Sequence, residues 1–158
     1  MIVIHPFAQK LRNGMSNAKT FPGWKELIPL LGESDIIQLG VKGEEPLVPD
    51  FREQLPLKAI TALVKEAALW VSIDSFLPHL AKHASRPGVV IWSVSDPLIF
   101  GYPENLNLLK DRRYLRANQF GIWEEQSFVA DAFLTAPEIA ERIAVWRAPK
   151  VRFLSGVA

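Results

Sequence analysis

Four short apolar runs recur along the chain and suggest buried strands. They are Ile2 to Ile4, Ile36 to Leu39, Leu69 to Ile73 and Val89 to Trp92, each dominated by β-branched, leucine or aromatic residues. None of them shows the alternation of apolar and polar positions that marks a strand with one wet face. Each pattern therefore predicts a strand that is covered on both faces.

Segments with helical spacing of apolar residues separate and follow these runs. The strongest lies at Leu57 to Ala68, where Leu57, Ile60, Val64 and Ala67 form one stripe. Three further helices are predicted, at about Phe21 to Leu31, Ser75 to His83, and Pro137 to Trp146. Strands that alternate with helices at this spacing predict βαβ units with right-handed crossovers.

The expected fold class is therefore α/β, a Rossmann-like three-layer α/β/α sandwich with a mainly parallel sheet. We expect one domain over residues 1–158, with a core over about 1–109, an irregular extension over 110–134 and a C-terminal helix over 135–147. Thr135 and Glu138 stand at the spacing of a capping box, which marks the start of that helix.

Three stretches punctuated by glycine, proline and polar residues follow predicted strands, at Gln9 to Phe21, Val41 to Pro56 and Ser93 to Pro103. In an open parallel sheet the ligand crevice lies beyond the carboxyl ends of the strands. We therefore expect these loops and the Asp74-Ser75 turn to converge on one rim of the sheet.

Composition narrows the classes of protein and of site. The 158 residues are 49% hydrophobic and 22% charged, which fits one globular domain with its own core. The chain has 18 Lys and Arg residues and 17 Asp and Glu residues, so its formal net charge is +1. That balance excludes bulk attraction of nucleic acid or anionic lipid, so an anion site has to be local. The lack of cysteine excludes disulfides, thiolate zinc sites and cysteine nucleophiles.

The first residues carry an apolar run of only a few positions before the chain turns polar. This is too short for the hydrophobic region of a signal peptide, and far below the ~20 residues that span a bilayer. We expect a soluble, cytoplasmic protein without a membrane span.

The segment from Ile73 to Ala81 is the most informative for chemistry. A buried strand ends at Asp74 and turns directly into a helix, and Pro78 fits only within the first turn, which places the N-cap at Ser75. Free N–H groups of a first turn bind phosphate well, and His79 follows about one turn later. A capped helix with a half-buried histidine and no ligand remains the alternative.

Together with other motifs, this segment resembles the C-terminal half of family-nine, heptosyltransferase-like glycosyltransferases, which have GT-B architecture. The motifs, in order, are Ile4-His5-Pro6, Lys19-Thr20-Phe21-Pro22-Gly23-Trp24, Leu39-Gly40 with Glu44 and Glu45, Asp74-Ser75-x-x-x-His79-Leu80-Ala81, Pro87-Gly88-Val89-Val90, and Ser95-Asp96-Pro97. The resemblance covers roughly the first two thirds of the chain. It implies a donor-binding domain that holds a nucleotide-sugar, as a single half of a GT-B fold.

The resemblance also implies roles for individual residues. Lys19 matches the lysine that pairs with donor phosphate, and Glu44 or Glu45 the acid that contacts the ribose. Asp74 matches the acid near the sugar, Ser75 the diphosphate contact and His79 the neighbouring histidine. The candidate donor-binding residues are His5, Lys19, Glu44, Glu45, Asp74, Ser75, His79 and Ser93. A solvated loop cation for Lys19 and an exposed charge run for the two glutamates are the competing interpretations.

This chain departs from the family pattern in two respects. Phe76 stands where the family has glycine, and the domain that carries the general base and the acceptor site is absent from this sequence. The expected function is binding of a nucleotide or nucleotide-sugar, with metal-independent glycosyl transfer only where a partner supplies the acceptor and base domain. The alternative is a non-catalytic nucleotide-binding or interaction module, as a homodimer or with a protein partner.

The sequence contains the elements of two other kinds of site. His5, His79 and His83 are a conceivable zinc trio, but Leu80 stands where the zinc-protease signature has glutamate, so we expect no metal. The basic run Lys110 to Arg116 has the composition of a nucleic-acid contact, and a solvated or structural segment is the favoured interpretation.

Overall fold

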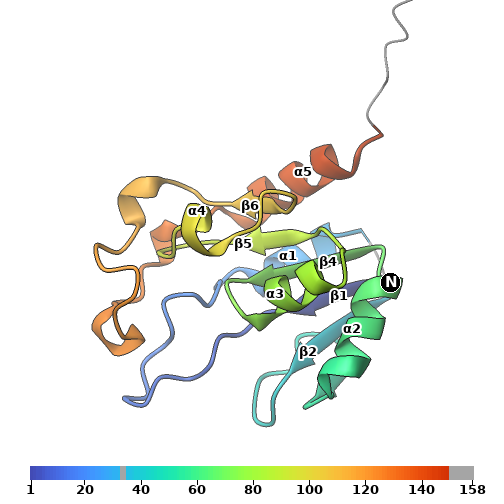
Figure 1. Cartoon of the computed structure of the whole chain (residues 1–158), viewed down its shortest axis with the longest axis horizontal. Helices are drawn as coiled ribbons and strands as arrows, with labels where there is room; N and C mark the ends of the chain where they lie inside the picture. The colour runs from blue at the N-terminus through green and yellow to red at the C-terminus, as the bar shows by residue number, and fades with distance from the viewer. Residues whose placement is uncertain (33–34, 150–158) are drawn as a thin grey trace, which may run out of the picture.

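The computed structural model describes residues 1–32 and 35–149 and contains one six-stranded sheet (Figure 1). The order of the strands is β3-β2-β1-β4-β5-β6, and every neighbouring pair is parallel. The strands are β1 (Ile2–His5), β2 (Ile36–Gly40), β3 (Asp50–Glu53), β4 (Leu69–Ile73), β5 (Val89–Ile91) and β6 (Leu106–Leu108). The predicted Rossmann-like α/β fold is confirmed.

Helices cover both faces of the sheet and divide the core in two. Side chains of α1 (Trp24–Leu30) and α5 (Ala136–Arg147) pack on one face, while those of α2 (Leu57–Glu66) and α3 (Phe76–His83) pack on the other. Successive strand residues point to opposite faces, so Ile2 and Ile4 join the first layer and Val3 joins the second. This burial on both sides explains the continuous apolar runs.

Capping side chains and proline explain where three of the helices begin or end. Ser75 is the N-cap of α3 and its Oγ accepts a hydrogen bond from the N–H of Leu77 at 3.3 Å, as the position of Pro78 predicts. At the start of α5, Thr135 and Glu138 cap each other's backbone N–H groups, which completes the predicted capping box. Pro29 lies inside α1, which ends one residue later.

The sequence patterns missed three short elements. β3 lies inside the predicted loop Val41 to Pro56, α4 (Pro97–Phe100) lies inside the predicted loop Ser93 to Pro103, and β6 follows it. β3 and β6 form the two edges of the sheet. Edge strands are partly exposed to solvent and therefore tolerate charged residues. The sequence of Asp50–Glu53 consequently has the pattern of a charged turn and not that of an apolar strand.

Residues 110–134, here called the strap, contain three single 3-10 turns, at Arg112–Tyr114, Trp123–Glu125 and Ala130–Ala132. The strap lies at the same end of the sheet as the loop that follows β1, shown in orange and blue at the left of Figure 1. It is fastened to the segment after β5, since the N–H of Arg116 donates to the carbonyl of Val94 at 3.0 Å and the Gln119 amide donates to the same carbonyl at 3.1 Å.

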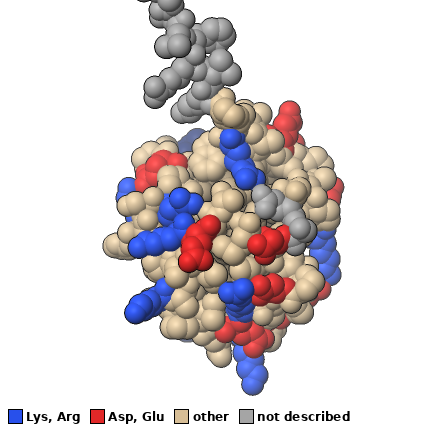
Figure 2. All heavy atoms as spheres, turned by 90° about the vertical axis from the view of Figure 1, so that its right-hand side faces the viewer, with Lys and Arg blue, Asp and Glu red and all other residues tan. Residues whose placement is uncertain are grey.

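Charges of both signs are mixed on the face of the molecule shown in Figure 2, where neither acidic nor basic side chains gather into a patch. This agrees with the near-zero formal charge. Within residues 1–32 and 35–149, no helix has the length and hydrophobicity that crossing a membrane requires.

Candidate functional site

The candidate site lies where the strand order reverses, at the carboxyl ends of β1 and β4. Chain connections leave this point in opposite directions, and open α/β sheets generally bind their ligands at such a point. His5 ends β1, and its Nδ1 shares a hydrogen bond of 3.0 Å with Oγ of Ser75, just after β4. Oγ of Ser75 also lies 2.9 Å from Oγ of Ser72, so the turn into α3 is tied to both strands.

His5 is held in the neutral form. Its side chain is only 7% exposed, and the Phe76 ring packs edge-on against it with ring centres 4.8 Å apart. Burial, together with the positive charge of Lys19, lowers the pKa of His5 from its ordinary 6.5 to about 4. At neutral pH the imidazole is therefore an uncharged hydrogen-bonding partner of Ser75.

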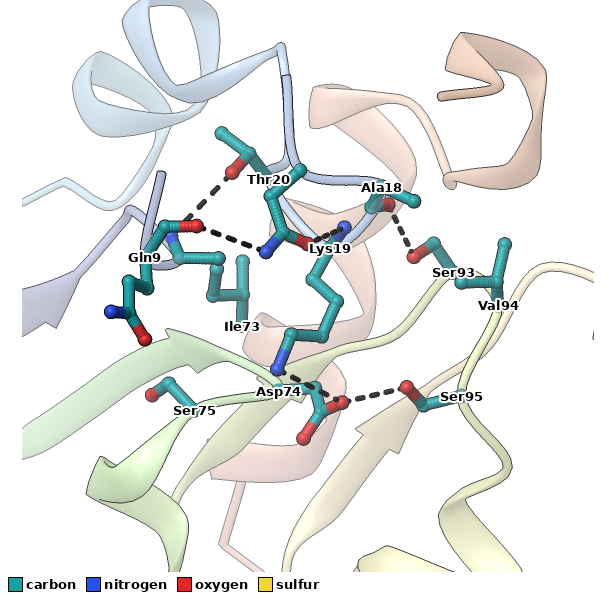
Figure 3. A network of polar contacts seen from close by, with 12 residues as sticks. Gln9, Ala18, Lys19, Thr20, Ile73, Asp74, Ser75, Ser93, Val94 and Ser95 are labelled. Atoms are coloured by element: carbon teal, nitrogen blue, oxygen red, sulfur yellow. Dashed lines mark hydrogen bonds and ion pairs between the residues drawn. The ribbon is translucent and has the colours of Figure 1, made fainter. Parts of the chain in front are cut away.

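Lys19 and Asp74 form an ion pair at the rim of the sheet (Figure 3). Their charged atoms lie 3.7 Å apart and their side chains are only 17% and 15% exposed, so this pair is well shielded from water. Ser95 donates to the same Asp74 oxygen at 2.7 Å. The geometry brings together two of the predicted site residues, with Ser95 as an addition.

The loop before Lys19 is fixed by polar contacts that aim the lysine at Asp74. Ser93 donates to the carbonyl of Ala18 at 2.8 Å, and the N–H of Lys19 donates to Asn17 Oδ1 at 3.1 Å. Asn17 in turn donates to the carbonyl of Gln9 at 3.0 Å. Ser93 therefore acts on the site through the backbone of this loop, as Figure 3 shows.

A mostly apolar pocket of about 190 Å³ adjoins this polar cluster and shares two walls with it, His5 and Phe76. It lies beyond the ends of β1, β2 and β3. Its other walls come from Leu39, Gly40, Val41, Arg52, Gln54, Leu55, Leu57 and Ile60. The site thus has an apolar half and a charged half, and His5 and Phe76 stand between them.

Glu44 lies beside this pocket. Its carboxylate accepts a hydrogen bond of 3.0 Å from the N–H of Val41 and lies so close over Gly40 that a Cβ at position 40 would collide with it. Burial raises the pKa of Glu44, against the opposing effects of the Val41 N–H and of Lys10. Glu45 points elsewhere and forms an exposed ion pair of 2.7 Å with Lys25.

His79 is exposed, and its hydrogen-bond partner lies outside α3. Its Nδ1 lies 2.9 Å from the hydroxyl of Tyr102, and the two rings pack edge to face. His5 is instead hydrogen-bonded to Ser75, so these two histidines contact different residues. Among the described residues, no three His, Cys, Asp or Glu side chains form a group that would hold a metal ion.

Four residues near the site are not among the candidate donor-binding residues: Ser72, Ser95, Arg116 and Trp123. Ser95 belongs to the Ser95-Asp96-Pro97 motif. The ring of Trp123 contacts both Lys19 Nζ, at 4.5 Å from the ring centre, and the Arg116 guanidinium, at 3.8 Å. Ser72 has a sequence signal, because it is the only polar residue of the buried strand β4. Arg116 stands at the end of the basic run Lys110 to Arg116, but no pattern indicates that it or Trp123 contacts Lys19, because both reach it only through the tertiary path of the strap.

The basic run of the strap is largely neutralised within the protein. Arg112 forms two hydrogen bonds with Asp96, and Lys110 pairs with Asp131. Arg113 pairs with Asp111 and also donates to the Tyr114 hydroxyl. These contacts favour a structural role for the run over a nucleic-acid surface.

Comparison with known proteins gives matches at the level of structure alone. No family model and no curated protein matches the sequence. E. coli heptosyltransferase WaaC with ADP matches with a TM-score of 0.58 and 21% identity over 90% of this chain and 43% of that chain. A family 9 glycosyltransferase from Veillonella parvula matches with a TM-score of 0.61 and 14% identity over 92% and 45%.

A third match is the dodecameric iron-containing heptosyltransferase TibC in complex with ADP-D-beta-D-heptose. The TM-score is 0.54 and the identity 16%, over 85% of this chain and 35% of that chain. This chain therefore spans less than half of the length of each of these structures. The likeness confirms the fold that the sequence resemblance implies: this chain has the heptosyltransferase-like fold of part of a family-nine glycosyltransferase.

Proposed function

We propose that this chain binds a nucleoside diphosphate or a nucleotide-sugar at the rim between β1 and β4, as the donor-binding half of a glycosyltransferase. The observation that carries the proposal is the division of the site into a shielded cationic part at Lys19 and an apolar pocket beside it. A nucleotide donor has the same two parts, a charged diphosphate and a flat base. WaaC and TibC, which share the fold, are bound to ADP and to ADP-heptose.

The diphosphate is assigned to Lys19 and the start of α3. A lysine ammonium makes charge-assisted contacts with phosphate oxygens, and the low exposure of Lys19 limits their screening by water. Ser75 contributes its hydroxyl at the N-cap, where the partial positive charge of the helix end also favours an anion. Asp74 and His79 complete this side as the proposed contacts of the sugar end.

The base and ribose are assigned to the pocket. Leu39, Leu55 and Ile60 supply apolar walls for a base, and Phe76 supplies a ring face or edge. Glu44, beside Gly40, holds a carboxylate where a ribose hydroxyl would donate to it. Glu45 is a weaker candidate because Lys25 already pairs with it.

For transfer, this chain supplies one half of the chemistry. Negative charge grows on the departing diphosphate, and Lys19 with the α3 N–H groups would stabilise it without a divalent ion. The general base and the acceptor site would come from a partner domain or from a second copy of the chain. TibC is dodecameric, so assembly occurs on this fold.

The proposal is tested by calorimetric titration of ADP, UDP, GDP and CDP in buffer with EDTA. One or more should bind without added Mg²⁺, and Lys19→Ala should raise the dissociation constant of that nucleotide about tenfold, because one charge-assisted contact of ~1.4 kcal/mol is lost. Lys65→Ala, an exposed lysine near the end of α2, is the matched control and should leave affinity unchanged. Equal affinity of Lys19→Ala and wild type contradicts the phosphate assignment.

One observation favours a second candidate, a binding module without transfer. Phe76 is 40% exposed and packs against His5 at the start of α3, where a bulky side chain restricts the approach of a diphosphate to the backbone. The two candidates differ in turnover. A nucleotide-sugar that binds but is neither hydrolysed nor transferred, alone or with a second domain added, supports the module.

A further inference from the structure

Trp123 is in contact with two cations from distant parts of the chain. The Lys19 ammonium lies 4.5 Å and the Arg116 guanidinium 3.8 Å from the centre of its ring. Such contacts are attractive because the ring face carries negative charge density, and tryptophan provides the strongest of them. The strap thereby fixes the side chain that is proposed to meet the donor phosphate.

Arg116 has an environment unlike that of the other strap cations. Its two terminal nitrogens donate to the carbonyls of Gly121 and Gln119, and its Nε is buried without a hydrogen-bond partner among the described residues. Burial lowers the pKa of Arg116, and the charge of Asp74 acts in the opposite direction. Arg116 is thus partly desolvated and lies in the field of the site.

Arg116 differs from the other cations of the strap in its lack of a carboxylate partner among the described residues. Within residues 1–32 and 35–149, Lys110, Arg112 and Arg113 each pair with a carboxylate at 4.0 Å or less, and Arg116 does not. Around Asp74 there are consequently two cations, Lys19 and Arg116, for one carboxylate. A surplus of positive charge in a shielded place favours an anion that carries more than one negative charge.

We propose that Arg116 is a second cation for the diphosphate of the donor, and that Trp123 is a positioning residue whose ring holds both Arg116 and Lys19 at the rim. This inference rests on the proposed function. It assigns to the strap the task of completing the phosphate subsite. Each terminal nitrogen of Arg116 carries a second N–H besides the one that donates to a carbonyl, and these remain for phosphate oxygens, while Lys19 supplies the point charge.

The test measures the binding of ADP, inorganic pyrophosphate and adenosine to Arg116→Gln. Loss of the charge should raise the dissociation constants of ADP and pyrophosphate about tenfold, leave that of adenosine unchanged and weaken the dependence of ADP binding on NaCl. Arg113→Gln is the matched control. Arg113 lies on the same strap and stacks on Tyr114 at 4.8 Å, but it pairs with Asp111 instead of facing Asp74.

A conservative variant separates charge from structure. Arg116→Lys keeps the charge and loses the guanidinium fork, so it should retain most of the pyrophosphate affinity. Equal losses for Arg116→Lys and Arg116→Gln, with adenosine weakened too, would show a structural role and overturn the inference. So would equal affinities of Arg116→Gln and Arg113→Gln for pyrophosphate. A wild-type protein that binds none of the nucleotides or pyrophosphate contradicts the proposed function itself.

Trp123 is tested by Trp123→Phe, with Trp146→Phe on α5 as control, since Trp146 is also partly exposed. The weaker contact of phenylalanine with both cations should raise the pyrophosphate dissociation constant about threefold. The effect should shrink in the Arg116→Gln background, because the two changes act on one arrangement. Full additivity of the two changes contradicts the positioning role.

Discussion

Replacing Gly88 with alanine is expected to lower the free energy of unfolding by about 3 kcal/mol, the upper end of what overpacking a core usually costs. Gly88 directly precedes β5 and faces the indole of Trp70 in β4. A Cβ there would lie 2.5 Å from Nε1 of Trp70 and closer still to two of the ring carbons. Trp70 is 1% exposed and its Nε1 donates to the carbonyl of Arg86. The ring therefore cannot move away from the added methyl group without losing packing or this hydrogen bond.

Urea denaturation followed by circular dichroism measures this loss. Gly121→Ala is the control, because the added methyl would meet only the side-chain amide of Asn118 closely, at 3.1 Å, and that side chain can move. In the Trp70→Phe background the cost of Gly88→Ala should fall, since the smaller ring leaves room for the methyl. A loss below about 1 kcal/mol would mean that the β4–β5 layer yields more easily than the packing indicates.

The four inner strands of the sheet could be predicted, because a strand that is buried on both faces has apolar residues at nearly every position. Leu69 to Ile73 is predicted and observed with the same bounds, and the other three predicted strands differ from the observed ones by one residue at one end. β3 and β6 were not predictable in this way. They lie at the edges of the sheet, where Asp50–Glu53 is half exposed and its charged side chains are tolerated.

The candidate site could be predicted where its residues flank a predicted strand. His5 and Ser75 meet because β1 and β4 are neighbours, and Lys19 meets Asp74 because the loop after β1 returns to the same rim. His79 shows the limit of local spacing. It stands one turn after Ser75, yet its partner is Tyr102, which the chain brings in after α4.

Arg116 and Trp123 mark the part of the site that no local pattern reveals. Their contact with Lys19 depends on how the strap crosses the rim, which follows from scattered anchors such as Arg112 on Asp96 and Arg116 N–H on Val94. None of these anchors has a period or a fixed spacing. The run Lys110 to Arg116 therefore looks like a solvated charge cluster until its partners are seen.

Acidification is expected to remove about 3 kcal/mol of stability through His5 alone. The pKa of His5 is lowered from 6.5 to about 4 in the folded protein, mainly by burial and then by Lys19. Between these two values the unfolded chain takes up a proton that the folded chain refuses, so unfolding is favoured increasingly as the pH falls. Above 6.5 the contribution is fully present, and below about 4 no more is lost through this group.

A comparison of urea denaturation of wild type and His5→Asn, from about pH 7 to about pH 4, isolates this effect. Asparagine keeps a polar side chain near Ser75 and does not titrate, so its variant should be less stable at neutral pH but should lose less on acidification. Carboxylates such as Asp96 and Asp131, whose pKa is lowered by basic partners, act alike in both proteins and cancel in the difference. Parallel losses in the two proteins would mean that His5 takes up its proton without unfolding, and that the wall between the pocket and the phosphate subsite admits water.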